Sequence, residues 1–285
     1  NHEYSTTTDP IAPDMPLVVL VNGMSASSSE IVSGALQDLD RAVILGTRTY
    51  GKGLVQAIRD VPFRGELKIT TGRYYIPSGR CIQAHSYNHD GSTKVIPDSL
   101  RHTFYTQAGR KVTDGGGIEP DSLIVNDTIP TMVYDLAQSD ILFDWVTEFV
   151  SQHSEILPPG QFHVDDSLYS KFCARVVESK FTYNRRSDEA MNLLRRVAAM
   201  EVYLQDAEQE MKALEAKFAP NLARDLHNMR QHIIPILESE IISRYYHQQG
   251  VIRHVMQNDK LYSNAVELIL SPERYHHILT PKNNI

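Results

Sequence analysis

The sequence predicts an α/β region followed by a region that is almost entirely helical. The chain has 285 residues, of which 41% are hydrophobic and 22% charged, a composition typical of a folded globular protein. Thirteen of the 15 glycines lie in residues 1–126, together with short apolar runs that favour strands. Residues 127–285 carry 16 Lys and Arg against 22 Asp and Glu, whereas residues 1–126 carry 12 against 13. This shift predicts a domain boundary at about residue 126, close to Pro130.

The net charge and the cysteine content exclude several classes of protein. A formal net charge of −7 argues against a protein that binds nucleic acid through a basic face. No apolar run reaches the roughly 18–20 residues that span a bilayer. Cys81 and Cys173 are too few for a disulfide-rich scaffold or a four-cysteine metal site, although they could form one bridge or stay free. The chain begins at Asn1 with no signal peptide, so we expect a longer protein whose export signal lies outside it.

The first elements are expected to form a βαβ unit. Residues 16–21 make a continuous apolar run, which suits a strand buried on both faces. A turn of small residues at 22–26 leads into a helix that opens at Ser27, and Glu30 stands at the capping-box spacing from this serine. Residues 42–46 read as a second buried strand. Strand, helix and strand at this spacing predict parallel strands with a right-handed crossover.

The remainder of the first region is predicted to hold two more strands and one irregular segment. The strands are expected at residues 54–61 and 67–75. Residues 84–116 show no clear periodicity and end in consecutive glycines, so we expect a long irregular excursion. The chain should return to the core at residues 118–121.

The second region, residues 127–285, contains one strong periodic signal. Apolar residues recur at alternating spacings of three and four from Ala190 to Phe218, which is the pattern of a heptad stripe. The pair Pro-Asn at 220–221 interrupts it, and a second stripe follows over 222–237. Two long amphipathic helices joined by a short break predict an antiparallel helical hairpin. This hairpin could bury its own stripes, or it could be an arm for docking or for homodimerisation.

The turn before the first predicted helix carries a candidate nucleophile. The hydroxyl of Ser27 would lie beside the unpaired N–H groups and the positive dipole end of the helix, which favour developing negative charge. The N–H of Ser28 could then donate to an oxyanion. The same position also suits a purely structural N-cap, because serine is among the preferred residues there. The turn alone does not distinguish the two roles.

A lysine between two glycines is the candidate base for this serine. Lys52 follows the second predicted strand. A lysine acts as a general base when desolvation lowers its pKa from about 10.4 to roughly 7–8, and we expect the neighbouring buried strands to desolvate this one. If the chain is extended here, Gln56 points to the same face and could hold the amine without pairing its charge. The alternative is a solvated lysine in a turn.

The same segment also matches part of a phosphate-binding loop. Residues 46–52 fit the pattern G-x-x-x-x-G-K and follow a predicted strand. The next residue is Gly53 rather than Ser or Thr, so the hydroxyl that binds magnesium is missing. Residues 54–58 favour a strand, whereas a phosphate-binding loop opens a helix. We therefore do not expect the chain to bind a nucleotide.

Together these motifs resemble the catalytic core of the carboxy-terminal processing (tail-specific) serine peptidases. The resemblance implies a ClpP/crotonase-like protease core, of which this chain carries a part, followed by a helical extension. The matching stretches are V-N-G-M-S-A-S-S-S-E-I at 21–31, G-A-L-Q-D at 34–38, G-T-R-T-Y-G-K-G at 46–53, Y-I-P-S-G-R at 75–80 and G-I-E-P-D at 117–121.

The resemblance also implies a role for each candidate residue. Ser27 matches the nucleophile and Lys52 the general base of a Ser/Lys dyad. Gln56 matches the residue that orients the lysine, and Ser28 matches the position that donates an oxyanion N–H. Asp38 matches a helix-end acid that is less directly catalytic.

The implied function is endopeptidase cleavage near protein C-termini through an acyl-enzyme. The partners would be proteins or peptides with accessible C-termini, no metal or organic cofactor would be required, and the family is usually found in the periplasm or cell envelope. A PDZ module and a further oxyanion donor normally precede the first strand seen here. We therefore expect a fragment that is inactive or weakly active alone. The alternative is a non-catalytic binding or scaffold protein on the same fold.

Overall fold

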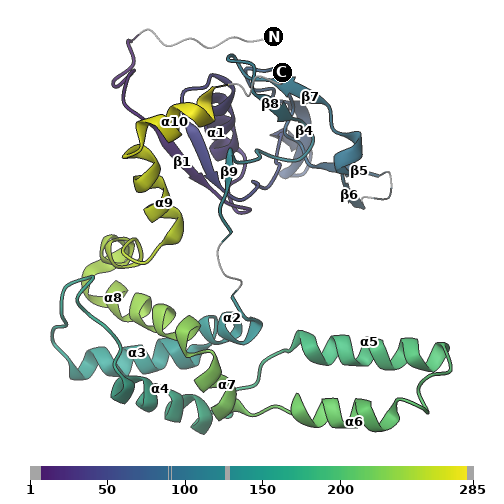
Figure 1. The fold of residues 1–285 in the computed structure, drawn as a ribbon, viewed down its shortest axis with the longest axis vertical. Helices are drawn as coiled ribbons and strands as arrows, with labels where there is room; N and C mark the ends of the chain where they lie inside the picture. Colours follow the sequence, from purple (N-terminus) through teal and green to yellow (C-terminus); the bar gives the residue numbers. More distant parts are fainter. Residues whose placement is uncertain (1–7, 89, 91, 126–128, 281–285) are drawn as a thin grey trace. The chain divides into compact units, whose positions relative to one another are not determined.

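The chain forms two compact units, one of residues 1–126 with 260–285 and one of residues 127–259 (Figure 1). The computed structural model describes residues 8–88, 90, 92–125 and 129–280. The predicted boundary at residue 126 falls within 126–128, which lie outside the described residues. The last part of the expected helical extension, 127–285, is helical over Lys260–Ile269 and Pro272–Leu279, but these helices are grouped with the first unit rather than with the second. None of the described helices has the length and apolar character to cross a membrane.

A parallel sheet forms the centre of the first unit. Strand β1 (Val18–Val21) pairs with β2 (Val43–Gly46), and β2 pairs with β9 (Ser122–Leu123), in the order β1-β2-β9. Helix α1 (Ser28–Asp38) connects β1 to β2. The predicted βαβ unit is therefore present, and its elements begin and end within about two residues of the predicted positions.

Helices lie against both faces of this sheet. Helix α1 contributes the half-buried Leu36 to a core formed by Val21, Ile44 and neighbouring side chains. Helices α9 (Lys260–Ile269) and α10 (Pro272–Leu279) pack on the other face, where Val43 and Leu45 are buried. A strand that is apolar on both faces needs a layer on each, which explains why the last two helices join the first unit. Strand β1 is less buried than predicted, since Leu20 is 39% exposed.

The other strands form three separate antiparallel pairs. Strands β3 (Leu54–Val61) and β4 (Gly65–Arg73) pair with each other, close to the predicted ranges. The segment 84–116, predicted to be irregular, instead contains two short hairpins and a 3₁₀ turn, η1 (Asp98–Leu100). Strands of three residues are too short to produce a periodic signal in the sequence. The hairpins are β5 (His85–Tyr87) with β6 (Thr93–Val95), and β7 (Thr103–Tyr105) with β8 (Lys111–Thr113).

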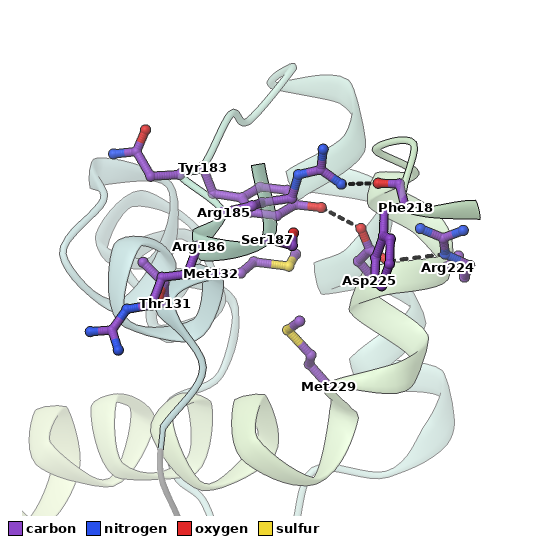
Figure 2. Close-up of a pocket in the computed structure, with 11 residues that line it drawn as sticks. Thr131, Met132, Tyr183, Arg185, Arg186, Ser187, Phe218, Arg224, Asp225 and Met229 are labelled. Atoms are coloured by element: carbon purple, nitrogen blue, oxygen red, sulfur yellow. Dashed lines mark hydrogen bonds and ion pairs between the residues drawn. The ribbon is translucent and has the colours of Figure 1, made fainter. Parts of the chain in front are cut away.

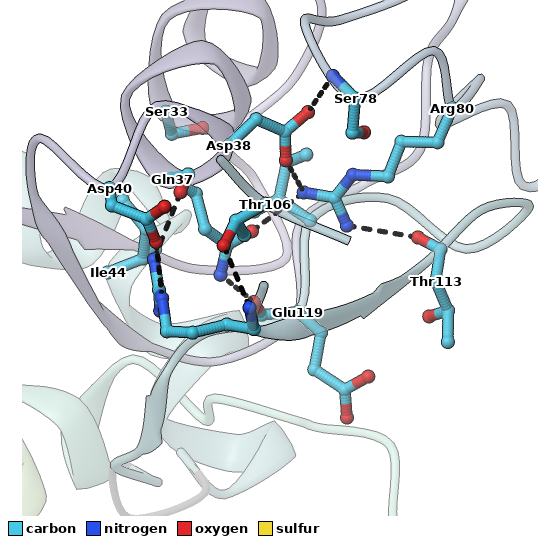
Figure 3. Close-up of polar contacts among 12 residues, drawn as sticks. Ser33, Gln37, Asp38, Asp40, Ile44, Ser78, Arg80, Thr106, Thr113 and Glu119 are labelled. Atoms are coloured by element: carbon cyan, nitrogen blue, oxygen red, sulfur yellow. Dashed lines mark hydrogen bonds and ion pairs between the residues drawn. The ribbon is translucent and has the colours of Figure 1, made fainter. Parts of the chain in front are cut away.

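A buried polar network holds the end of α1 (Figure 3). Asp38 and Arg80 form an ion pair at 2.8 Å, and both are at most 2% exposed. Arg80 also donates to the side-chain oxygen of Gln37 at 2.8 Å and to the Thr113 carbonyl at 3.0 Å. Removing one partner of such a pair leaves a buried charge uncompensated. The network therefore joins α1, the 76–80 segment and β8. In this network the carboxylate of Asp38 neutralises the buried guanidinium of Arg80, which is a structural role.

The second unit is helical and has one apolar core. Its core helices are α2 (Thr131–Ala137), α3 (Asp140–Gln152), α4 (Asp166–Glu178), α7 (Leu222–Asn228) and α8 (Arg230–Val255). The single tryptophan, Trp145, lies in this core with Phe172 and Leu237. Helices α5 (Arg186–Met200) and α6 (Glu208–Lys217) form a separate pair, which we call the arm (Figure 1).

The prediction of a hairpin between one helix over 190–218 and a second over 222–237 is wrong, and a shorter hairpin forms within the first stripe. The stripe expected to make one helix over 190–218 is broken after Met200, and its two halves, α5 and α6, run antiparallel. Arg195 joins them through Glu208 at 3.3 Å and Glu215 at 2.6 Å. The chain reverses at Val202, whose φ of 66° is uncommon for a β-branched residue. The second predicted stripe does not pair with the first, because its apolar residues belong to the helical core.

Candidate active site

Ser27 lies at the turn between β1 and α1, in a strained backbone conformation. It is the N-cap residue of α1, with φ 57° and ψ −115°. Such dihedrals in a residue other than glycine cost on the order of 1–3 kcal/mol and persist only where surrounding contacts enforce them. Ser27 is half-buried, whereas Ser28, the first residue of α1, is exposed. The N–H of Ser28 is one of those at a helix start that have no hydrogen-bond acceptor within the helix. The turn thus places the Ser27 hydroxyl at the start of α1, next to the N–H of Ser28.

Lys52 lies in the loop between β2 and β3, where two glycines allow a close approach to the 83–84 segment. A Cβ on Gly51 would lie 2.3 Å from the Cβ of Ala84, and one on Gly53 would lie 2.9 Å from the nitrogen of Gln83. The Gly51 carbonyl accepts from the Ala84 N–H at 2.9 Å, and the Gly53 N–H donates to the Gln83 side chain at 2.8 Å. The loop backbone is therefore held on both sides of Lys52.

Lys52 and Gln56 share one pocket. The pocket has a volume of about 550 Å³ and combines apolar with polar side chains, among them Met24, Tyr50, Lys52, Leu54, Gln56 and Tyr87. Ala26 also lines it, whereas Ser27 itself does not. Lys52 and Gln56 therefore line the same pocket, and Ser27 directly follows Ala26, which is also part of the lining.

The environment of Lys52 differs from the one expected. Lys52 and Gln56 are both exposed, so the neighbouring strands of this chain do not desolvate the amine. The expectation of a buried lysine is therefore wrong for this chain. Strand β3 begins at Leu54, directly after this loop, which agrees with the predicted strand and argues against a phosphate-binding loop.

Glu30 connects the two candidate catalytic residues and was not identified as a site residue from the sequence. Its side chain is fully buried. One carboxylate oxygen accepts from the N–H groups of Ser27 and Lys52, each at 2.9 Å. The other accepts from the Thr49 hydroxyl at 2.5 Å and from the Gly51 N–H at 2.7 Å. The carboxylate binds the backbone of Lys52, so it positions that residue without an ion pair to its amine.

The sequence predicted only one of the contacts that Glu30 makes. The capping-box spacing of Ser27 and Glu30 predicted the contact with the serine N–H, and the structure shows it. The contacts with Thr49, Gly51 and Lys52 cross about twenty residues of chain, so no local pattern could reveal them. The N–H groups of Gly51 and Lys52 and the hydroxyl of Thr49, together with the first turn of α1, stabilise the buried negative charge.

The second unit contains a smaller cavity, and several of the polar side chains around it form hydrogen bonds (Figure 2). Its volume is about 250 Å³, and Met132 and Met229 contribute to its lining. Around it, Tyr183 donates to Asp225, and Arg224 donates to the same carboxylate. Within the described residues, no group of three His, Cys, Asp or Glu side chains could hold a metal ion. Cys81 and Cys173 carry free thiols.

Two family profiles match the chain. Residues 1–101 match the family described as "Peptidase family S41". Residues 132–269 match the family described as "Probable PDZ-protease, C-terminal helical domain". The first match contains Ser27, Lys52 and Gln56, and the second covers all the core helices of the helical unit except the first residue of α2.

The curated relatives are processing proteases that are longer than this chain. A carboxy-terminal-processing protease of Bartonella bacilliformis is 53% identical over 26% of this chain and 17% of its own length. A carboxyl-terminal-processing protease of Picosynechococcus is 46% identical over 34% of this chain and 21% of its own length. A chloroplastic C-terminal processing peptidase of Tetradesmus obliquus is 45% identical over the same shares. The chain therefore spans about a fifth of the length of these relatives.

Proposed function

The first 101 residues of the chain belong to peptidase family S41, and from this premise we propose that the chain is part of a serine endopeptidase that cleaves near protein C-termini with a Ser27/Lys52 dyad. Family membership implies a serine-type peptidase with protein substrates. The observation that carries the proposal is the contact of one buried carboxylate, Glu30, with the backbone N–H groups of both Ser27 and Lys52. Through these two hydrogen bonds, Glu30 connects the turn that carries the proposed nucleophile, Ser27, to the loop that carries the proposed base, Lys52.

The proposed reaction begins when the Oγ of Ser27 attacks the scissile carbonyl carbon. Lys52 Nζ takes the serine proton and then gives it to the leaving amine, which leaves an acyl-enzyme on Ser27. The N–H of Ser28 donates to the oxyanion that forms in the transition state. In the second half-reaction Lys52 Nζ takes a proton from a water molecule as the water oxygen attacks the acyl carbon. The bond from that carbon to Ser27 Oγ then breaks, and Lys52 returns the proton to Oγ, which releases the acid and regenerates Ser27. Gln56, in the same pocket, orients the lysine amine through its uncharged amide.

The exposure of Lys52 sets a condition on this mechanism. A base must be unprotonated, and an amine in water holds its proton at neutral pH. We propose that bound substrate, and parts of the full-length protein beyond this chain, exclude water from the amine. Activity should therefore rise with pH, and the isolated chain should be inactive or weakly active.

Covalent labelling tests the assignment of the nucleophile. A fluorophosphonate probe incubated with the full-length protein should modify Ser27, identified by mass spectrometry of the modified peptide. The variant Lys52→Ala should be labelled at least about tenfold more slowly, because the serine has lost its base. The matched variant Ser29→Ala removes an exposed hydroxyl of the same turn and should be labelled at the wild-type rate. Labelling at another residue, or equal labelling of Ser27→Ala, would contradict the proposal.

The second candidate function is a non-catalytic binding or scaffold protein. The exposed position of Lys52 and the absence of Ser27 from the pocket lining favour it. The labelling experiment separates the two candidate functions. In a scaffold protein no base activates Ser27, so the probe should not modify Ser27 faster than the neighbouring serines.

We also propose that the arm mediates a homodimer, and that the protease lies in the periplasm or cell envelope. Two helices cannot bury the whole stripe: Leu193, Val197 and Met200 remain 54%, 39% and 83% exposed. A second copy of the arm would cover these side chains in a four-helix arrangement.

Deleting the arm tests the dimer. Arg185 donates to the Phe218 carbonyl, so the ends of the arm are adjacent and a short Gly/Ser linker can replace residues 186–217 without disturbing the core helices. Light scattering should give a dimer for the full-length protein and a monomer for this deletion variant. An unchanged molar mass would remove the proposed role of the arm.

A further inference from the structure

The loops that carry Ser27 and Lys52 are also connected through their carbonyl groups. The hydroxyl of Tyr74 donates to the Lys52 carbonyl at 2.5 Å and lies 3.3 Å from the Ser27 carbonyl. Tyr74 follows directly after β4, and its own N–H donates to the Gly53 carbonyl at 3.1 Å. A tyrosine distant in sequence from both residues therefore contacts both peptide groups.

We propose that the Tyr74 hydroxyl is a positioning group for the dyad, which holds the peptides of Ser27 and Lys52 side by side so that the amine stays within reach of the serine. This inference rests on the proposed function, because it assigns Tyr74 a role at that same site. Glu30 binds the N–H groups of the two residues, and Tyr74 binds their carbonyl groups. Glu30 and Tyr74 thus hold the peptide groups of Ser27 and Lys52 together, Glu30 through their N–H groups and Tyr74 through their carbonyl groups.

The strained turn explains why two such contacts are useful. The dihedrals of Ser27 are unfavourable for serine and require surrounding contacts to maintain them. The Ser27 carbonyl also accepts from the N–H groups of Glu30 and Ile31, so the start of α1 holds it independently. The Lys52 carbonyl takes the shorter contact with Tyr74. The hydroxyl therefore acts mainly on the lysine loop, which it fixes against a turn that α1 already defines.

The hydroxyl keeps its proton in the range where a lysine base works. Tyr74 is half-buried, and burial, then the negative charge of Glu30, then Cys81, raise the pKa of this phenol above its ordinary value of about 10. Lysine-dependent activity rises as the pH rises. A phenol whose pKa is raised remains a donor across that rise, so the contact to Lys52 persists where it is needed.

The test is the variant Tyr74→Phe in the full-length protein, assayed on a fluorogenic peptide. We expect kcat to fall about 10- to 100-fold with KM changed less than about threefold, because ground-state binding does not use the hydroxyl. The rising limb of the pH profile should move to higher pH by at least about half a unit, because an amine that is held less firmly is shielded less well by the bound substrate that we propose excludes water from it.

Tyr275→Phe is the matched control. The Tyr275 hydroxyl is buried in the same unit and contacts the N–H and carbonyl of Leu17 at 3.0 and 3.1 Å, so its loss removes comparable hydrogen bonds away from the dyad. This variant should keep the wild-type kcat and pH profile. An equal fall of kcat in both tyrosine variants would overturn the positioning role, since it would indicate general destabilisation.

The parallel variant Ser27→Ala separates the failure of this inference from the failure of the proposed function. If Ser27→Ala cleaves the peptide at the wild-type rate, the proposed function falls and the role of Tyr74 falls with it. If Ser27→Ala is inactive and Tyr74→Phe retains the wild-type kcat and pH limb, only the role of Tyr74 is overturned. Should Tyr74→Phe fail to fold, a crystal structure of the full-length wild-type protein decides: a hydroxyl more than 3.5 Å from the Lys52 carbonyl overturns the inference.

Discussion

Replacing Ser27 with alanine is expected to abolish proteolysis, lowering kcat/KM by at least about a thousandfold. In the proposed reaction this hydroxyl supplies the oxygen of the acyl-enzyme, and Ser27 is the residue at the N-cap of α1. Lys52→Ala should reduce the rate by a similar factor, because the serine is a weak nucleophile without its base. The double variant should be about as inactive as either single variant, since residues that act as a unit give non-additive losses.

The controls for this prediction come from the same elements. Ser29→Ala changes an exposed serine two residues away, and Lys68→Ala changes an exposed lysine of β4. Both should cleave an unfolded protein substrate at the wild-type rate, and all four single variants should melt within a few degrees of the wild-type protein. A Ser27→Ala or Lys52→Ala variant that degrades this substrate at nearly the wild-type rate would refute the dyad.

The parts of the fold that the sequence predicted are those determined by local patterns. The apolar runs at 16–21 and 42–46 predicted β1 and β2, and the small residues between them predicted the turn to α1. Strand β3 begins and ends where its β-favouring residues do. Each of these features depends on neighbours within a few positions, which is the range over which periodicity carries information.

The parts that were missed depend on contacts between distant segments. Nothing in residues 260–279 indicated that α9 and α10 would cover Val43 and Leu45, more than two hundred residues earlier. The heptad stripe predicted helix correctly, but its continuity hid the reversal at Val202, where the chain folds the stripe back on itself. A periodic pattern states which face is apolar, and it does not state which surface that face will meet.

The candidate site divides in the same way. Ser27, Lys52 and Gln56 could be named from their local context and from the resemblance, and the last two share a pocket. The contacts of Glu30 with the lysine loop and of Tyr74 with the two carbonyls could not be named, because they join three loops that lie far apart in the sequence. The exposure of Lys52 corrected the remaining expectation, since burial depends on every segment around the side chain.

The variant Glu30→Gln should lower both the free energy of unfolding of the first unit and the kcat of the protein. An amide keeps one oxygen and replaces the other with an NH₂ group, so at least one pair of donors loses its acceptor and faces another donor. Leaving buried donors unsatisfied costs about 1–3 kcal/mol each, so the loss of stability should be on the order of 2–4 kcal/mol. Whichever pair of donors is lost, the side chain at position 30 then holds the turn of Ser27 and the loop of Lys52 together with fewer hydrogen bonds, so kcat should fall at least about a hundredfold even well below the melting temperature.

Glu238→Gln provides a matched control, because it alters another buried carboxylate in the second unit. Glu238 is 7% exposed, accepts from the Val164 N–H at 2.8 Å and contacts His254 at 2.9 Å. Its variant should lower the melting transition reported by the fluorescence of Trp145, which lies in the core of that unit, and should leave kcat per folded molecule unchanged. Glu30→Gln should instead speed amide exchange in the segments around Ser27 and Lys52. If the two glutamates reduce activity equally, Glu30 is a buried structural acid like Glu238, and the connection between nucleophile and base must be sought elsewhere.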